Sequence, residues 1–294
     1  MDQLKATVAA ALRKNFSPHP FSVENLTVIH QGRFANAIVF RYRDDDYDLV
    51  IKDYSHCPTI VRKTVGRLFI AHEAKTLKRL QGIQGVAPQG YKLSDLMLAY
   101  PYIEGSSLSV LRRRGKRLPP AFFRELESTV RQMHHRGVVH LDMRNLGNIL
   151  CGQDGRPYLI DFQSALGFAR LPRWLQPLLR ATDLSGVYKG WLALCDAPLA
   201  PRKRRFFDSF NRIRKLWVFR GYPLIRSRRN EEGAVFSDIP AFNKDTRMTL
   251  LDKPDVGAIA KAFLKFLLVA SFTLLAPAAL YADAVLIGGG VALA

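Results

Sequence analysis

Short apolar runs occupy the first hundred residues and predict β-strands. The runs are rich in β-branched and aromatic residues and lie at 26–30, 37–42, 47–52, 91–93 and 96–103. Gly32 and the acidic stretch 44–46 supply turn residues between the first three runs. This part of the chain therefore predicts a small sheet.

Helical spacing of apolar residues appears at three places. Leu68, Leu77 and Leu80 indicate a helix at about 67–80, between the third and fourth predicted strands. Pro119-Pro120 opens a second helix that runs to about residue 135. The first 16 residues form a third, amphipathic stretch that lacks the apolar segment of a signal peptide. The order of strands, helix, strands and then mostly helices indicates a mixed lobe followed by a helical lobe.

The end of the chain has a different composition. Residues 266–282 are uncharged and mostly apolar, which is the short end of the length that spans a membrane. Lys261 and Lys265 precede this run and would keep the preceding part of the chain on the cytoplasmic face of the inner membrane. We expect C-terminal anchoring, either by a transmembrane helix or by a helix that dips into one leaflet. Pro277 and Asp283 favour the alternative, a buried hydrophobic helix.

The charge balance of the chain indicates which kind of partner it binds. The chain of 294 residues has a formal net charge of +19, which favours an anionic partner. The imbalance is steepest at 170–230, where 15 Lys and Arg residues stand against 3 acidic residues. We expect an anion-facing surface there that binds an anionic membrane or a phosphorylated glycolipid. No nucleic-acid motif accompanies the charge, so we expect no nucleic-acid partner, and the oligomeric state stays open.

The cysteine pattern limits the class of protein. Cys57, Cys151 and Cys195 are scattered and form no CxxC pair. This spacing argues against a disulfide framework and against a zinc site, and it fits a reducing compartment.

The strongest chemical signal is the string VVHLDMRNLGNIL at 138–150, followed by YLIDFQ at 158–163. A polar loop in the first string presents Asp142 and Asn148, and a short strand in the second delivers Asp161. Two carboxylates and an amide thus converge at one hairpin. Such a group suits Mg²⁺, which binds one or two carboxylates together with substrate phosphates.

These two strings resemble the catalytic loop and the metal loop of the protein-kinase-like superfamily, H-R-D-L-x-x-x-N followed by D-F-G. The resemblance covers about residues 25–195 and implies ATP and Mg²⁺ as cofactors. It implies that Asp142 orients the acceptor hydroxyl, that Arg144 neutralises the transferring phosphoryl group, and that Asn148 and Asp161 hold the metal. The implied fold is α+β and two-lobed, with a small antiparallel-sheet N-lobe at 1–104, a helical C-lobe at 105–255 and a hydrophobic tail at 256–294.

Three positions depart from the family pattern. Leu141 replaces the arginine, which argues against regulation through a phosphorylated activation loop. Gln163 replaces the glycine of D-F-G. The spacing from Asp142 to Asn148 is one residue longer than in the family, so Asn145 stands as the alternative to Asn148.

The first lobe carries the nucleotide-binding part of the resemblance. Lys52 in DLVIKDY resembles the strand lysine that contacts the phosphates, and Glu73 in AHEAKTL occupies the place of its helical partner. HQGRFANA resembles a weak glycine-rich loop in which Gly32 is the second glycine. Residues 99–103 resemble the linker that binds adenine. Asp183 is either the buried acid that braces the catalytic loop or a helix N-cap.

The acceptor is the open part of this interpretation. The basic segment and the tail resemble lipopolysaccharide core kinases (Kdo and heptose kinases), so the leading expectation is a kinase for a lipid-linked sugar. A membrane-anchored serine/threonine protein kinase with a protein substrate is the second candidate. A non-catalytic pseudokinase scaffold is the third, and the presence of Lys52, Glu73, Asp142 and Asp161 argues against it. Small-molecule antibiotic kinases are disfavoured because cationic substrates would prefer an acidic acceptor site.

Overall fold

The computed structural model describes residues 1–32, 36–169, 171–173 and 175–216. The first part of this region is a five-stranded antiparallel sheet with the strand order β1-β2-β3-β5-β4. Its strands are β1 (Leu26–His30), β2 (Ile38–Arg43), β3 (Asp48–Asp53), β4 (Tyr91–Ser94) and β5 (Met97–Pro101). The helices packed with this sheet are α1 (Asp2–Asn15), the short α2 (Thr59–Val61) and α3 (Arg67–Leu80), which a π-helical turn, Arg62–Gly66, joins to α2.

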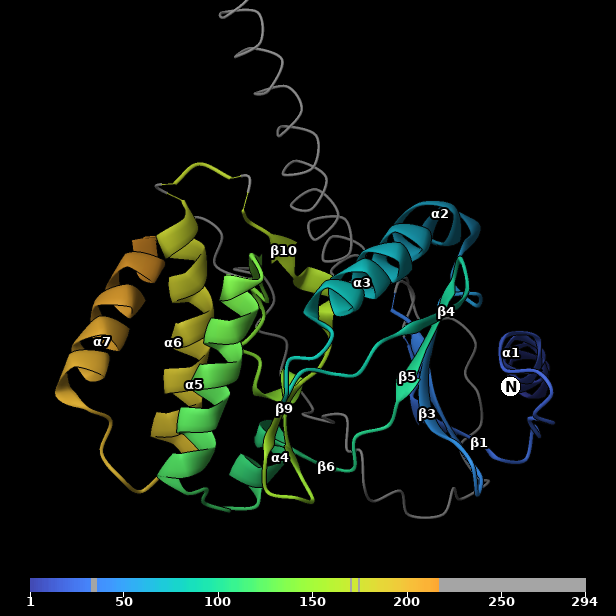
Figure 1. Cartoon of the computed structure of the whole chain (residues 1–294), viewed down its shortest axis with the longest axis horizontal. Helices are drawn as coiled ribbons and strands as arrows, with labels where there is room; N and C mark the ends of the chain where they lie inside the picture. Colours follow the sequence, from blue (N-terminus) through green and yellow to red (C-terminus); the bar gives the residue numbers. More distant parts are fainter. Residues whose placement is uncertain (33–35, 170, 174, 217–294) are drawn as a thin grey trace, which may run out of the picture.

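The two faces of this sheet bury different helices because successive side chains of a strand point to opposite faces. On β3, Leu49 and Ile51 pack in the apolar cluster that includes Val8 and Leu12 of α1. Val50, between them, packs in the cluster that includes the buried face of α3. Helix α1 therefore covers the outer face, and Figure 1 shows it at the far edge of the molecule.

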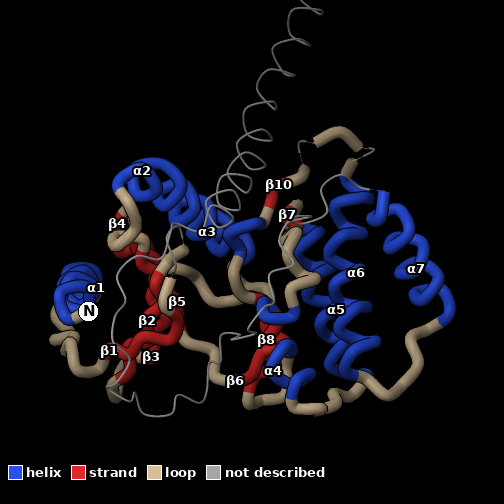
Figure 2. Tube along the Cα trace, turned by 180° about the vertical axis from the view of Figure 1, so that it is seen from behind, coloured by secondary structure: helices blue, strands red, loops and turns tan. Residues whose placement is uncertain are grey.

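The second part is mainly helical. It contains α4 (Leu108–Arg113), α5 (Pro120–His135), α6 (Gln176–Leu194) and α7 (Pro201–Leu216), and α5, α6 and α7 lie side by side in Figures 1 and 2. Two small sheets accompany them: β6 (Gly105–Ser107), β8 (Ile149–Gly152) and β9 (Pro157–Leu159) form one, and β7 (Val138–Val139) with β10 (Leu166–Gly167) forms the other. The structure is thus an α+β fold of the kinase-like type.

One apolar cluster runs through both parts. It joins Val50 and Ile70 of the sheet-bearing part to Phe123, Leu126 and Trp191 of the helical part. The segment between β5 and β6 is the covalent linker that crosses beside this core. The predicted catalytic and metal loops lie on the helical side of the same boundary.

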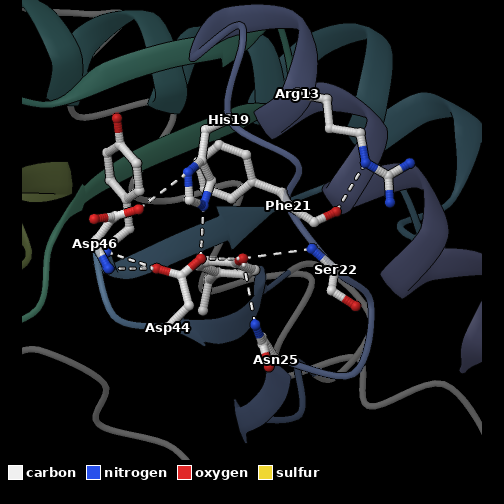
Figure 3. Close-up of polar contacts among 9 residues, drawn as sticks. Arg13, His19, Phe21, Ser22, Asn25, Asp44 and Asp46 are labelled. Atoms are coloured by element: carbon white, nitrogen blue, oxygen red, sulfur yellow. Dashed lines mark hydrogen bonds and ion pairs between the residues drawn. The ribbon is translucent and has the colours of Figure 1, made fainter.

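A polar cluster fixes the segment that joins α1 to β1 (Figure 3). The His19 ring lies between two carboxylates, with Nε2 2.7 Å from Asp44 and Nδ1 3.5 Å from Asp46. Burial opposes ionisation of Asp44, but hydrogen bonds from Tyr42 and His19 and from the backbone N–H groups of Tyr47 and Asp46 outweigh it and lower its pKa to about 2. This cluster ties the N-terminal segment to the β2–β3 turn.

Most of the predicted elements of the first lobe are confirmed within a residue or two. The predicted strand at 96–103 is the exception, because it ends at Pro101 and the chain then leaves the sheet as the linker. The predicted helices at 67–80 and 120–135 coincide with α3 and α5. The predicted tail at 256–294, with the run 266–282, lies outside the described residues. Within the ranges given above, no helix has the length and hydrophobicity needed to cross a membrane.

Candidate active site

Lys52 on β3 is bonded to two carboxylates that come from distant parts of the chain. Its Nζ lies 2.7 and 3.0 Å from the two carboxylate oxygens of Glu73 on α3 and 3.0 Å from Oδ1 of Asp161. The side chains of Lys52 and Glu73 are almost fully buried, while Asp161 keeps 35% of its side-chain surface exposed. One ammonium group therefore ties the sheet, helix α3 and the predicted metal loop together.

Burial and charge act in opposite directions on this group. Burial alone would lower the pKa of Lys52, but the carboxylates of Asp161 and Glu73 outweigh it and raise this pKa well above its ordinary value. Lys52 therefore stays cationic throughout the neutral range. A fixed buried cation can donate charge-assisted hydrogen bonds to a phosphate group, and the partly exposed carboxylate beside it can bind a metal ion.

The predicted catalytic loop follows β7. Asn148 Nδ2 donates to Asp142 Oδ2 at 3.0 Å and to the Asp142 carbonyl at 3.2 Å. The side chain of Asn145 is mostly exposed; its Nδ2 donates to Asn148 Oδ1 at 3.2 Å, and its Oδ1 accepts from the N–H of Gly147. The extra residue of this loop is accommodated by the 3₁₀ turn Leu146–Asn148. The structure therefore brings Asn148, rather than Asn145, against Asp142.

The metal loop lies against the same residues. The N–H of Ile160 donates to the carbonyl of Asn148 at 3.1 Å, which places Asp161 next to Asn148. Two non-glycine residues here, Leu141 and Asp161, have φ of +64°, a left-handed conformation that costs roughly 1–3 kcal/mol each. Such strain persists only where surrounding contacts hold it, and it is concentrated at functional sites.

Asp183 of α6 holds the start of the catalytic loop. This fully buried carboxylate accepts from the N–H groups of His140 and Leu141, both at 2.8 Å, and from His134 Nε2 at 3.0 Å. Helix α6 begins at Gln176, so the alternative interpretation of Asp183 as an N-cap is wrong. The bonds to Leu141 and its neighbour supply the contacts that stabilise the left-handed turn before Asp142.

Arg144 is turned toward helix α6. Its Nη1 donates to Ser185 Oγ at 3.0 Å, its carbonyl accepts from Lys189 Nζ at 2.6 Å, and its guanidinium carbon lies 5.8 Å from the centre of the Phe207 ring. Arg144 is thus fixed between the catalytic-loop segment and helices α6 and α7. The predicted role of Arg144 in neutralising a phosphoryl group stays a prediction.

Helix α3 contacts the metal loop at two further points. The backbone N–H of Phe162 donates to Glu73, and His72 Nε2 lies 2.6 Å from the carbonyl of Ala165. These contacts flank the ion pair between Lys52 and Glu73, so α3, β3 and the metal loop form one connected unit.

The linker is held to the sheet by a second arginine. Arg41 of β2 forms a two-pronged bond with Asp48, with distances of 2.8 and 2.6 Å, and its guanidinium carbon lies 3.6 Å from the centre of the Tyr102 ring. The N–H of Tyr102 donates to the carbonyl of Asp48 at 2.8 Å. Asp48 therefore connects both members of this stacked pair, which lies in the segment predicted to bind adenine.

Gly32 lies just past the end of β1, where the predicted glycine-rich loop begins. A Cβ at this position would fall 2.1 Å from the carbonyl oxygen of Asn36, so the turn admits only glycine. Residues 33–35 of this loop lie outside the described residues.

The oxygen ligands at the site fit Mg²⁺. Asp161 and Asn148 are hard oxygen donors from one hairpin, and Asp142 adjoins them. Mg²⁺ is usually bound by one or two such groups and completes its octahedron with nucleotide phosphates and water. Asn148 and Asp161 are therefore the residues that would hold it.

Sequence reasoning missed part of the support around the site. Ser185, Gly186 and Lys189 follow Asp183 on α6, and no pattern in the chain sets them apart from an ordinary helix surface. The contact between Arg41 and Tyr102 was missed as well, because the stacking of two residues distant in the sequence produces no recognisable sequence spacing. Helix α6 has buried residues on almost every side. Its sequence therefore has no apolar stripe from which the side facing the catalytic loop could be predicted.

One comparison with known proteins gives a match. The family model described as the RIO domain matches residues 33–182, which is just over half of the chain. The matched range contains Lys52, Glu73, Asp142, Asn148 and Asp161 and ends one residue before Asp183. No curated protein matches the chain. The expected closeness to lipopolysaccharide core kinases is not shown by this match.

Proposed function

Because this chain belongs to the RIO domain family, an atypical protein-kinase-like family, we propose that it transfers the γ-phosphate of ATP to an acceptor hydroxyl with the help of Mg²⁺. One observation carries this proposal: Lys52 is bonded at the same time to Glu73 and to Asp161. Kinases need the strand lysine paired with its helical glutamate, and the metal-binding aspartate in place, before they transfer phosphate.

The chemistry follows from the positions of the side chains. Lys52 binds the α- and β-phosphates, and Asp161 and Asn148 hold Mg²⁺. When bound, Mg²⁺ neutralises the charge on the phosphate oxygens. Asp142 orients the acceptor hydroxyl and takes its proton, while Asn148 keeps the Asp142 carboxylate in place through the 3.0 Å bond.

The acceptor that the family supports best is a serine hydroxyl of a protein, since members of this family are atypical serine kinases. The alternative acceptor is a lipid-linked sugar, such as a lipopolysaccharide core. A specific observation favours this alternative. Arg202, Arg205 and Arg212 are exposed along one side of α7, and they form no ion pair with another residue of the described part of the chain.

The location of the protein is a related proposal. Arginines next to a membrane bind anionic headgroups at about 1 kcal/mol each. The stripe on α7 leads into a basic sequence and then into the apolar run at 266–282. We therefore propose attachment to the cytoplasmic face of the inner membrane, with α7 directed at an anionic surface.

A non-catalytic scaffold is the weakest of the three candidates. A scaffold has no need of a strained Asp161 or of a buried lysine with two carboxylate partners. Both features cost free energy of folding and are expected where phosphate and metal must be bound.

The test is transfer of label from γ-labelled ATP with Mg²⁺. Purified protein is incubated with total membrane extract and, in parallel, with the protein fraction freed of lipid, and wild type is compared with Asp142→Ala. Label on serine of polypeptides, absent with the variant, supports the protein kinase. Label in the lipid and glycan fraction supports the sugar kinase. Label in neither fraction, together with no labelling of the enzyme itself, contradicts phosphotransfer.

A further inference from the structure

One side of helix α6 contacts the catalytic loop through residues that the proposed chemistry does not use. These residues are Asp183, Ser185, Gly186 and Lys189. At about 100° per residue they occupy an arc of about 160° on the helix. They meet consecutive parts of the loop, so α6 supports the loop along its length.

The contacts follow the order of the loop residues. Asp183 binds the N–H groups before Asp142. Gly186 touches the backbone of Met143, where a Cβ would lie 2.6 Å from the carbonyl carbon. Lys189 Nζ binds the carbonyl of Arg144 at 2.6 Å. Asp142 therefore lies between one anchor that precedes it and another that follows it.

We propose that Lys189 is a positioning residue for phosphoryl transfer, because it fixes the backbone after Asp142 as Asp183 fixes the backbone before it. This inference rests on the proposed function for its kinetic consequence. The left-handed turn at Leu141 gives the physical reason. Asp183 holds this turn, and Lys189 holds the chain three residues further on. Loss of the second anchor would let the segment between them, which includes Asp142, move away from the strained turn.

The nature of the contact supports a dedicated role. A hydrogen bond from an ammonium group is charge-assisted and about twice as strong as a neutral one. Lys189 is partly buried, and its ammonium binds the carbonyl of Arg144, two residues after Asp142 in the loop. Ser185, which is fully buried, holds the Arg144 side chain in the same region, so the backbone and the side chain of Arg144 are fixed separately.

The kinetic test compares Lys189→Met with Lys189→Arg. We expect Lys189→Met to lower kcat on the order of 10- to 100-fold, since a small displacement of a catalytic group has effects of this size. The KM for ATP should change little because the nucleotide is held by the sheet and linker. Lys189→Arg keeps a cationic donor and should recover most of kcat. Lys116→Met is the control, because Lys116 is exposed in a loop far from this contact along the chain.

A second measurement does not depend on turnover. Hydrogen exchange of the purified full-length protein follows the amides of Leu141 and Asn145, which bond to Asp183 and to the Asp142 carbonyl. Faster exchange of these amides in Lys189→Met, but not in Lys189→Arg or Lys116→Met, supports the inference. If Lys189→Met does not fold, Lys189→Gln replaces it in both experiments.

The outcomes separate the two proposals. Unchanged exchange and unchanged kcat in Lys189→Met overturn the positioning role and leave the phosphotransferase intact. A kcat that falls together with the melting temperature, without recovery in Lys189→Arg and without faster exchange of the two amides, indicates a merely structural lysine and also overturns the positioning role. If wild type transfers no phosphate, the proposed function fails, and the exchange data alone decide whether Lys189 anchors the loop.

Discussion

Asn148 Nδ2 donates to the carboxylate of Asp142 across 3.0 Å, although the loop between them is one residue longer than in other kinase-like catalytic loops. The extra residue is absorbed by the 3₁₀ turn Leu146–Asn148, and it adds a second amide, Asn145, whose Nδ2 binds Asn148 Oδ1. The loop thus has an amide pair in place of a single asparagine.

The amide pair predicts unequal effects of two substitutions. Asn148→Ala should lower kcat by about 100-fold or more and raise the Mg²⁺ concentration needed for half-maximal rate, because it removes both the proposed metal ligand and the Asp142 contact. Asn145→Ala should cost about 10-fold or less, since it only orients Asn148. Rates measured against Mg²⁺ concentration check this. Equal effects of the two variants would count against the assignment of Asn148.

The buried Lys52 predicts a loss of phosphoryl transfer that another cationic side chain at this position does not restore. Lys52→Met should lower transfer by at least about 100-fold, and Lys52→Arg should not recover it, because the larger guanidinium does not fit between Glu73 and Asp161. Asp161→Asn should abolish turnover through weaker Mg²⁺ binding. Initial rates and Mn²⁺ binding to the full-length protein are the measurements. Normal turnover by Asp161→Asn would refute the metal assignment.

Arg41, which binds Asp48 and stacks on Tyr102 of the linker, predicts an effect on nucleotide affinity. Arg41→Met removes the stack on Tyr102 and the bond to Asp48, so the linker should lose its fixed place. We expect the KM for ATP to rise about 5- to 10-fold with little change in kcat, as for the loss of about 1–1.4 kcal/mol of binding. Arg43→Met on the same strand is the matched control, since Arg43 is exposed. A similar KM for both variants would show that the contacts of Arg41 with Asp48 and Tyr102 do not affect nucleotide binding.

The polar cluster around Asp44 predicts a pH-dependent contribution to stability. The pKa of Asp44 is lowered to about 2 in the folded protein, against an ordinary value of 3.8. A lowered pKa stabilises the fold above the ordinary value, and this stabilisation is lost as the pH falls from about 4 toward 2. Asp44→Asn should therefore lower the free energy of unfolding by about 1–2 kcal/mol at pH 7, and by less at pH 3.5. Urea unfolding at both pH values tests this, and a difference that grows on acidification would contradict it.

Gly186 predicts an inactive protein that keeps every catalytic group. A methyl group at this position would lie 2.6 Å from the Met143 backbone, so Gly186→Ala must push the catalytic loop away from α6. We expect a loss of about 1–3 kcal/mol in stability and a larger proportional loss of kcat. Gly115→Ala is a useful contrast: Gly115 has φ of +64° but nothing lies within 4 Å of the added group, so it should cost stability alone.

The residues to which we assign the chemistry could be picked out of the sequence because reactive groups of this kind occur in a fixed order along two short strings. Lys52 and Glu73 were found by the elements that carry them, since a lysine on a strand followed by a glutamate on the next helix leaves a readable pattern. The predicted strands and helices of the first lobe were right for a similar reason, because apolar periodicity reflects which face is buried.

The supporting contacts were not readable for a different reason. Whether Lys189 reaches the Arg144 carbonyl depends on how α6 packs on the loop, and this packing joins residues 45 positions apart. Asp183 was ambiguous because an acid within a helical sequence is compatible with a cap or with a buried brace, and only the start of α6 at Gln176 decides between them. Helix α6 carries buried side chains on almost every side, so its sequence lacks the single apolar stripe that shows which face of a surface helix is buried.

The apolar cluster that joins Val50 and Ile70 to Phe123 and Trp191 makes the two lobes a single cooperative unit. Among the described residues, the faces where the lobes meet share this one cluster, so melting should show one transition in which sheet and helices are lost together. A protein nicked in the linker would accordingly keep its halves associated. The two lobes would then unfold together, and a destabilising substitution in either lobe would lower the amount of folded protein as a whole.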